Sequence, residues 1–481
     1  MIKLLNKVYI FFIIDTIFTL LLLMVNISDF SFMIWPLMIG FIIYLFTLDT
    51  YDLITNQIIL LIDFNVIYDI LWRKSSVNIP INCKILIDII SIIIIFKILI
   101  NYNLLKKTLR DPIIWLMIVF IIFSVGVAVV NKIPFIEYLM SLRIYIRFLP
   151  VYIVLSNFKL EYNRNYLYIF IAINLFLIPI QSLISSYDDV SGVFGIRNVH
   201  ILLLFLIIMT AIITTIYCKK VIKVYLYLLG IIIIFLICGF GEIKIGMVII
   251  PIEILLIILL NTINPIKLFT SIIVCIFMVN LGLKVLVKIS PQFENFFDKD
   301  IIKQNIIDYT MKPNNPDYSL GRLENIVYSY NNILTTPSSR ITGLGVGSAM
   351  PPETYYYQLE KHSRGRDVIS LYMTKLYTYY GPYFGYHFSS MNIIFLETGY
   401  IGIIIYLSIL MIFIKRSILL IIKSGRVIDK AIGNASVALI TSLIGLMFYY
   451  NYILDRGAII LVVITLAITT NISKNINNNR R

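Results

Sequence analysis

Few side chains in this sequence are suited to acid-base chemistry. The three histidines, His200, His362 and His387, are scattered along the 481 residues and form no metal-binding pattern. H-E-x-x-H, G-x-S-x-G, P-loop and C-x-x-C patterns are missing, so the common hydrolase, NTPase and metalloprotease signatures are absent. An enzyme made of this chain would work through isolated cations and a general base on an anionic substrate. We expect it to need no metal and no other cofactor.

Two arginines fall within an otherwise apolar segment. Arg143 and Arg147 are four residues apart, so on a helix they project from the same side. A cation inside the membrane is costly, which favours a functional role, but a long side chain near a helix end can also reach the interface. Both interpretations stay open, and we predict that the pair helps to bind the anionic substrate.

Three further cations stand beside short polar or glycine-containing motifs. Arg197 lies in GVFGIRN just before an apolar run, Lys244 lies in GFGEIK just after one, and Arg322 lies in SLGR. Lys244 could instead pair with Glu242 at the surface, and Arg322 could be a solvated helix residue. All three are candidates for holding an anionic substrate.

The composition indicates which elements position these residues. The chain is 59% hydrophobic and 14% charged, with a mean hydropathy of +0.91, whereas an ordinary soluble domain has about 25% charged residues. Apolar runs such as IFTLLLLMV, IIDIISIIIIF and LLLFLIIMTAIITTI recur along the chain, and a bilayer is crossed by roughly 20 such residues. The sequence predicts an all-α polytopic membrane protein rather than a β-barrel, whose strands would alternate in polarity.

We predict about 12 to 14 transmembrane helices. They form an N-terminal bundle of about 11 spans in residues 1–287 and a C-terminal bundle of about three spans, with a short cytoplasmic tail, in 390–481. A large, partly helical extracytoplasmic loop, residues 288–389, separates the two. The candidate spans are residues 8–25, 31–47, 54–71, 85–100, 113–130, 142–156, 166–183, 199–217, 222–238, 245–260, 267–285, 390–414, 431–449 and 457–470. Residues 54–71 and 142–156 contain charged side chains and could instead be re-entrant or interfacial.

The distribution of Lys and Arg predicts the orientation. At the predicted span ends, basic residues gather on the side of both termini, which the positive-inside rule places in the cytoplasm. The same rule explains the net charge of +14 without a nucleic-acid partner. The four cysteines lie in or beside apolar runs and indicate neither disulfides nor a zinc site. We therefore expect a multi-pass protein of the cytoplasmic (inner) membrane.

The polar segment from about residue 288 to 386 is too long and too aromatic for a linker. Apolar residues at helical spacing predict a short amphipathic helix that packs over the membrane domain: Leu323, Ile326, Val327, Tyr330, Ile333 and Leu334. The second half of the segment is rich in tyrosine, whose rings could stack on sugars or simply lie at the membrane interface.

Short motifs follow one another from the start of this predicted helix. They are SLGR at 319–322, a turn at Thr336-Pro337, GLGVGS at 343–348, and HFSSMN at 387–392 leading into LETGYIG at 396–402. This order resembles the O-antigen polymerase and O-antigen ligase superfamily, the Wzy- and WaaL-type membrane glycosyltransferases. In that family the corresponding GR, G-x-G, histidine and E-x-G-x-x-G motifs occur in the large extracytoplasmic loop and the span after it. The resemblance covers residues 319–404 most clearly and implies a GT-C-like fold.

The resemblance implies roles for individual residues. His387 matches the family histidine proposed to activate the acceptor hydroxyl, and Arg322 matches the loop arginine thought to contact the pyrophosphate. Arg197 and Lys244 fall where the family places further cations. Two departures favour the polymerases over the ligases. Phe388, rather than an asparagine, follows His387, and a lysine stands at position 244 where an arginine is common.

The implied function is polymerisation of undecaprenyl-pyrophosphate-linked oligosaccharide repeat units into O-antigen, capsule or exopolysaccharide at the outer face of the membrane. The glycosyl transfer would be metal-independent and inverting, since no protein nucleophile is evident and a charge-neutralised pyrophosphate leaves readily. Membrane lipid surrounds such an enzyme, and a flippase and a chain-length regulator of the same pathway are expected partners.

Three alternatives stay open. The chain could be an O-antigen ligase that transfers the finished glycan to an acceptor, a polysaccharide flippase or export component, or a scaffold protein without catalysis. No internal repeat is evident, which disfavours a transporter built of repeated halves.

Overall fold

The computed structural model describes residue 10 and residues 13–21, 33–60, 81–157, 199–261, 265–289, 326–348, 389–449 and 456–478, apart from positions 51, 55, 58, 242, 244 and 328. Within these ranges the chain is helical and contains no strand. The prediction of an all-α protein is confirmed for this part of the chain.

The helices of the bundle coincide with the predicted apolar runs in most cases, although residues 102–108 and 135–141 are helical outside those runs. They are α2 (Ile34–Thr47), α4 (Ile81–Ile100), α5 (Tyr102–Thr108), α6 (Pro112–Val130), α7 (Phe135–Ile146), α8 (Leu149–Asn157), α10 (Val199–Cys218), α11 (Val224–Phe240), α12 (Gly246–Asn261), α13 (Pro265–Ile289), α19 (Ser390–Lys423), α20 (Val427–Tyr449) and α21 (Arg456–Asn478). Between α13 and α19 the described residues form a π-helical turn, Ser329–Ile333, and the short helix α16, Pro337–Thr342.

Six described segments are long and apolar enough to cross a membrane: Pro112–Val130, Phe135–Asn157, His200–Cys218, Ser390–Lys423, Val427–Phe448 and Ile459–Ile476. The bent pair α4 and α5 makes a seventh if it is one broken span, and four shorter apolar helices lie in α2, α11, α12 and α13. The protein is therefore a multi-pass membrane protein. The total of about 12 to 14 spans stays a prediction, because span 166–183, residues 61–71 of span 54–71 and most of the predicted loop 288–389 lie outside the described residues.

The uncertain segment 142–156 belongs to a membrane-spanning stretch. The helices α7 and α8 together form the candidate span Phe135–Asn157, and the helix is interrupted at Arg147 and Phe148. The span is therefore longer than predicted, because it begins at Phe135, seven residues before the predicted start at residue 142.

Polar caps explain two changes of direction. Asn101 accepts a hydrogen bond from the Leu104 N–H at 3.1 Å and starts α5, which is bent by 101° from α4. The predicted turn at Thr336-Pro337 is instead the start of α16. Thr336 Oγ1 accepts from the Ser339 N–H at 3.1 Å, and Pro337 takes the first helical position, where a missing N–H costs nothing.

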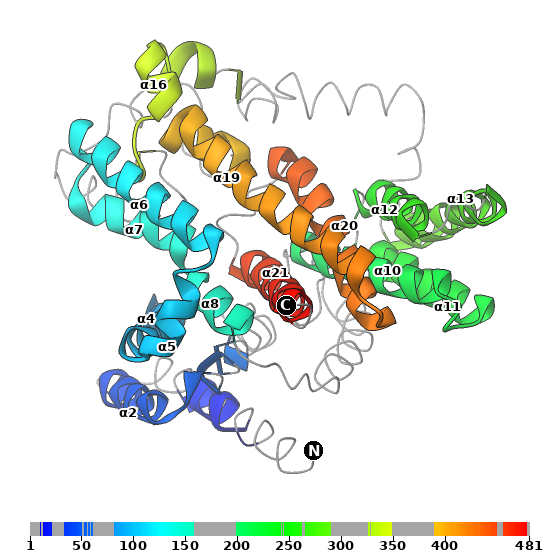
Figure 1. The fold of residues 1–481 in the computed structure, drawn as a ribbon, viewed down its shortest axis with the longest axis horizontal. Coiled ribbons are helices and arrows are strands. Elements are labelled where there is room, and N and C mark those ends of the chain that lie inside the picture. The colour runs from blue at the N-terminus through cyan, green and yellow to red at the C-terminus, as the bar shows by residue number, and fades with distance from the viewer. Residues whose placement is uncertain are drawn as a thin grey trace.

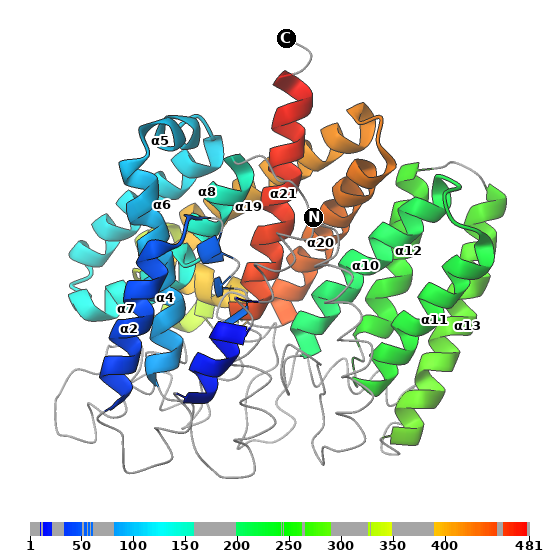
Figure 2. The ribbon, with the colours of Figure 1, turned by 90° about the horizontal axis from the view of Figure 1, so that it is seen from below.

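The helices form three groups side by side (Figure 1). The C-terminal helices α19, α20 and α21 lie in the middle, between α2 and α4–α8 on one side and α10–α13 on the other. The same order is visible at right angles to this view (Figure 2). The middle group thus joins the two parts of the N-terminal bundle.

The two ends of the bundle differ in charge. One end, here the basic face, includes α5 and the C-terminal end of α21 (Figure 2). Among the described Lys and Arg residues at this end are Lys97, Lys106, Lys107, Arg110, Lys219, Lys220, Lys223, Lys415, Arg416, Lys423, Arg426, Lys430 and Lys474. The opposite end, here the loop face, includes the end of α6, the start of α19 and residues 336–348. The predicted cytoplasmic location of the basic face agrees with this asymmetry and stays a prediction.

Candidate functional site

Two of the six predicted site residues lie within the described residues. His387, Arg322, Arg197 and Lys244 lie outside them. Arg143 and Arg147 are described, on α7 and at its C-terminal end. The geometry of the candidate site is therefore built from α7 and the elements that contact it.

Arg143 and Arg147 bind the same carboxylate, that of Asp88 on α4. Arg143 Nη1 donates to Asp88 Oδ2 at 3.0 Å, and Arg147 Nε donates to Asp88 Oδ1 at 3.1 Å. The Arg147 side chain is fully buried, whereas that of Arg143 is 30% exposed. The prediction that the two arginines project from the same side of the helix is confirmed. Within the pair, Arg143 is the more accessible to a ligand.

Asp88 was missed by the sequence analysis. It lies in the apolar run 85–100, and a carboxylate inside a predicted span is itself a signal, since such groups pair with cations of neighbouring helices. The same signal applies to Glu397, which the sequence analysis placed in a motif but gave no role.

Residues 343–348, here the glycine turn, pack into the membrane domain. Val346 is fully buried in a cluster that includes Phe120 of α6, Leu142 of α7 and Ile405 of α19. A segment of the predicted loop is therefore anchored between three membrane helices rather than lying above them.

The glycine turn binds α19 at a break in that helix. Gly399 has a positive φ of 59° and ψ of −157°, so α19 consists of two helical parts. The backbone N–H groups of Leu344 and Gly345 donate to the carbonyls of Leu396 and Glu397 at 2.8 and 2.9 Å. Buried backbone groups outside regular helix require such partners, because an unpaired N–H or C=O away from water is costly.

Two glycines make this close approach possible. A Cβ atom on Gly399 would lie 2.5 Å from the carbonyl oxygen of Ile341, and one on Gly343 would lie 2.4 Å from the backbone carbon of Glu397. Both residues also have a positive φ, which other residues adopt at a cost. The G-x-G and E-x-G motifs therefore fit against each other and require glycine at both positions.

Glu397 connects the glycine turn to α7. Its carboxylate is buried, with 1% of the residue exposed. Oε1 accepts from the Gly347 N–H at 2.9 Å, and Oε2 accepts from the Tyr145 hydroxyl at 2.7 Å. Tyr145 stands between Arg143 and Arg147 in the sequence of α7. One side chain therefore joins the broken helix, the loop segment and the arginine-bearing helix.

The predicted amphipathic helix is present in part. Residues 326–333, apart from 328, are helical and end in the π-helical turn. Ile333 and Leu334 are buried, as expected, whereas Val327 is 55% exposed. Leu323, the first apolar residue of the pattern, lies outside the described residues.

A second contact holds this segment on α19. The guanidinium of Arg340 lies 3.9 Å from the centre of the Tyr330 ring, and its Nε donates to the Leu334 carbonyl at 2.9 Å. Tyr330 in turn stacks on Phe395 of α19, with ring centres 6.3 Å apart. Arg340 thus holds Tyr330 and the Leu334 carbonyl in this segment.

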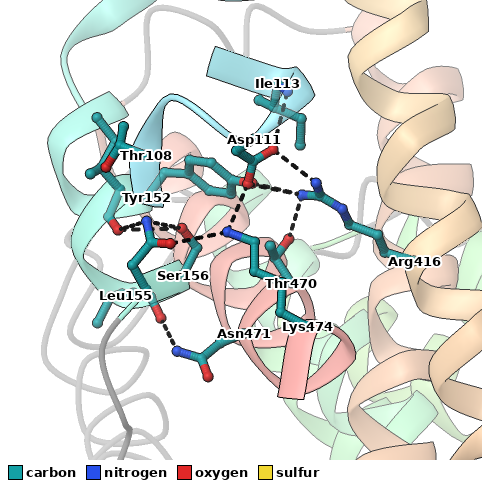
Figure 3. Close-up of polar contacts among 12 residues, drawn as sticks. Thr108, Asp111, Ile113, Tyr152, Leu155, Ser156, Arg416, Thr470, Asn471 and Lys474 are labelled. Carbon is teal, nitrogen blue, oxygen red and sulfur yellow. Dashed lines mark hydrogen bonds and ion pairs between the residues drawn. The ribbon is translucent and has the colours of Figure 1, made fainter. Parts of the chain in front are cut away.

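The basic face contains a buried ion cluster (Figure 3). Asp111 Oδ1 accepts from Arg416 Nη2 at 2.8 Å, and Asp111 Oδ2 accepts from Lys474 Nζ at 3.0 Å and from the Tyr152 hydroxyl at 2.9 Å. Arg416 Nη1 also donates to Tyr152 at 2.8 Å and to Thr470 at 3.2 Å. The cluster joins the start of α6 to α8, α19 and α21.

Asp111 precedes the span Pro112–Val130 and caps it, since Oδ1 accepts from the Ile113 N–H at 3.1 Å. Burial alone would raise the pKa of Asp111, but the hydrogen bonds and charges of Arg416 and Lys474 outweigh it and hold the pKa of this carboxyl below its usual range. The carboxylate is therefore ionised at neutral pH. Its charge is bound by cations and is not available for acid-base chemistry there.

The described part of the candidate site consists of the arginine pair of α7 and the glycine turn bound to α19. The arginine pair could contact an anion through Arg143, and the predicted general base, His387, lies outside the described residues. No three His, Cys, Asp or Glu side chains within the described ranges come together as ligands for a metal ion. Neither a scan against protein-family models nor a search of curated proteins found a match to this sequence.

Proposed function

We propose that this protein is a membrane glycosyltransferase that polymerises oligosaccharide repeat units carried on undecaprenyl pyrophosphate. The transfer takes place at the outer face of the cytoplasmic membrane, which we assign to the loop face. The product is a surface polysaccharide. The isoprenoid tail of the donor explains why the site belongs to a bundle of apolar helices, because the donor stays in the membrane throughout.

The reaction is a single displacement at the anomeric carbon of the donor sugar. The acceptor hydroxyl oxygen forms the new glycosidic bond, and the bond from the anomeric carbon to the pyrophosphate oxygen breaks. The electron pair leaves with the lipid pyrophosphate, and the acceptor proton passes to the imidazole of His387. A positioned general base contributes about 10² to 10⁴ in rate. Arg322, Arg197, Lys244 and the arginine pair of α7 stabilise the departing pyrophosphate.

The contact between the glycine turn and the broken helix α19 supports this proposal most directly. The GLG motif at 343–345 and the ETG motif at 397–399 are far apart in sequence, and they form one hydrogen-bonded unit. The resemblance to the polymerases and ligases rests on these same motifs. The unit also contacts Tyr145 on the helix that carries the predicted phosphate-binding arginines.

The test is the glycan length distribution, measured by gel, in cells that lack this protein and are complemented with variants. Wild type is expected to restore long chains. His387→Ala and Arg322→Ala at equal protein level are expected to leave one repeat unit on its normal carrier. His362→Ala is a matched control, since it removes a histidine of the same loop that the proposal does not use.

Other results would change the assignment. Long chains that accumulate on the lipid carrier in the deletion strain would indicate a ligase. An unchanged ladder of glycan lengths on the gel of the deletion strain would contradict the proposal. A full ladder with both His387→Ala and Arg322→Ala would favour a scaffold protein.

A further inference from the structure

Glu397 lies where three segments of the chain meet. It belongs to the first helical part of α19, its Oε1 binds the Gly347 N–H of the glycine turn, and its Oε2 binds Tyr145 of α7. Its own carbonyl accepts from the Gly345 N–H at 2.9 Å. The carboxylate is too deeply buried, at 1% exposure, to touch a substrate in this arrangement.

The glycine turn is held by one buried apolar side chain and by hydrogen bonds, and Glu397 supplies two of the acceptors. The turn inserts one apolar side chain, Val346, between α6, α7 and α19. It also makes hydrogen bonds to Leu396, Glu397 and Asn131, whose Nδ2 donates to the Leu344 carbonyl at 2.9 Å. Removal of the carboxylate leaves the buried Gly347 N–H without an acceptor, which is costly in a dry environment.

The same carboxylate also fixes the arginine-bearing part of α7. Tyr145 is two residues from Arg143 and two from Arg147, so its hydrogen bond to Glu397 links the arginine-bearing part of α7 to the turn. The loop and the arginines are thereby held at a fixed distance from each other. A site that neutralises a pyrophosphate needs such fixed positions, because cations that must reorganise during the reaction contribute less.

We propose that Glu397 is a positioning residue, whose carboxylate holds the glycine turn and α7 in the arrangement that the transfer reaction needs. The reaction part of this inference rests on the proposed function. The structural part of the inference is that Glu397 holds the glycine turn in its docked position against α19. This part does not depend on the proposed function.

Conservative substitution separates the role of hydrogen bonding from that of charge. In Glu397→Gln the amide oxygen can accept from the Gly347 N–H, and the amide N–H can donate to the Tyr145 hydroxyl, which accepts as well as donates. Glu397→Leu has a similar size and can accept neither hydrogen bond. Glutamine is therefore expected to preserve docking, and leucine to lose it.

Docking of the turn is measured with a cysteine at position 348. Ser348 is 7% exposed, so Ser348→Cys is expected to react slowly with N-ethylmaleimide while the turn is docked. The background is the full chain in membranes, with its native cysteines replaced by alanine: Cys83, Cys218, Cys238 and Cys275. Glu397→Leu is expected to raise the labelling rate about tenfold or more, and Glu397→Gln by less than about threefold.

A control and a second variant guard against general loss of folding. Glu253→Leu removes another buried carboxylate, which accepts from Ser442 Oγ at 2.5 Å on α20 and makes no described contact with the loop. It is expected to leave labelling at position 348 unchanged. If Glu397→Leu does not accumulate, Glu397→Ala replaces it, because alanine also has no acceptor for the Gly347 N–H or the Tyr145 hydroxyl.

The glycan ladder provides the second readout. At equal protein level, Glu397→Leu is expected to lose long chains, and Glu397→Gln to retain them. Unchanged labelling in Glu397→Leu would overturn the proposal, whatever the glycan shows. Raised labelling with a full ladder would overturn the link between docking and reaction, provided that His387→Ala still abolishes the ladder. A full ladder in His387→Ala as well would count against the proposed function and leave the docking inference standing.

Discussion

Two buried carboxylates join elements at opposite ends of the membrane domain. Asp111 at the basic face and Glu397 at the loop face are 2% and 1% exposed. Asp111 binds the cations of Arg416 and Lys474, which come from two other helices. Glu397 binds a tyrosine hydroxyl and a backbone N–H of the glycine turn.

The two carboxylates have different partners, so the loss of a partner costs a different amount of stability at each end of the molecule. Removing one partner from a buried ion pair costs about 3 to 5 kcal/mol, because a charge stays behind without compensation. Removing one hydrogen bond to a buried carboxylate costs about 1.5 to 3 kcal/mol. The cluster at the basic face therefore stabilises the bundle of helices, whereas Glu397 determines where one loop segment lies.

The largest effect is expected for Asp111→Ala. It leaves two cations without their carboxylate and removes the cap of α6, so the free energy of unfolding should fall by about 3 to 5 kcal/mol. Thermal unfolding in detergent, followed by size-exclusion chromatography, measures the loss. Lys106→Ala, on the exposed surface of α5, is the control and should change stability by less than about 0.5 kcal/mol. If the losses of unfolding free energy in Asp111→Ala and Arg416→Ala simply added up in the double variant, the two residues would not interact. That result would contradict the cluster.

Gly399→Ala should have the next largest effect. The φ of 59° alone costs alanine about 1 to 2 kcal/mol, and the new Cβ would lie 2.5 Å from the Ile341 carbonyl oxygen. The expected loss of stability is accompanied by faster labelling of the cysteine introduced at position 348, because the helix break and the turn fit together. Gly445→Ala in α20 is the matched control. Nothing lies within 4 Å of its new Cβ, and it should gain about 1 kcal/mol of stability. Equal changes at both glycines would show that the break is not under steric constraint.

A smaller effect is expected for two matched tyrosines. Tyr145→Phe and Tyr152→Phe each remove one hydroxyl that donates to a buried carboxylate, at 2.7 and 2.9 Å. Each should lower the stability by about 1.5 kcal/mol, the lower end of the range for a hydrogen bond to a buried carboxylate. The comparison predicts different consequences, because Tyr145→Phe should also speed the labelling of Ser348→Cys, whereas Tyr152→Phe should leave it unchanged. Equal labelling in both variants would contradict the division between the two ends.

The smallest effect concerns pH. The pKa of Asp111 is lower in the folded protein than in the unfolded chain, where it is about 3.9. Its contribution to stability is therefore fully present above about pH 4 and is lost as pH falls through the lower, folded pKa. The difference in unfolding temperature between wild type and Asp111→Asn should stay constant from about pH 5 to 8 and shrink below about pH 4. A difference that changes between pH 5 and 8 would mean that another group governs the cluster.

Individual residues show what could and what could not be predicted from the sequence. The spacing of Arg143 and Arg147 predicted their common side, because helical periodicity is a local property. Their shared partner, Asp88, could not be assigned, since any carboxylate in a neighbouring span was possible. Residues 390–414 were predicted as one unbroken span, and the break at Gly399 was missed because a glycine inside an apolar run does not by itself indicate a positive φ.

The loop motifs illustrate the same limit at the candidate site. The resemblance grouped the G-x-G and E-x-G motifs by their order, and nothing in that order indicated that Gly345 donates to the Glu397 carbonyl or that Gly347 donates to its carboxylate. Such contacts depend on side chains and backbone groups that are brought together by the packing of α6, α7 and α19.

The sequence by itself determined that this is a multi-pass membrane protein, helical in the part that the structure describes, with basic residues gathered at one end. Apolar runs of this length must form helices in lipid, because every backbone hydrogen bond then has a partner within its own segment. The tertiary structure alone decided which buried carboxylate binds cations and which binds the loop, because these partners come from distant segments. The cost of leaving any of them unpaired in a medium without water holds both arrangements in place.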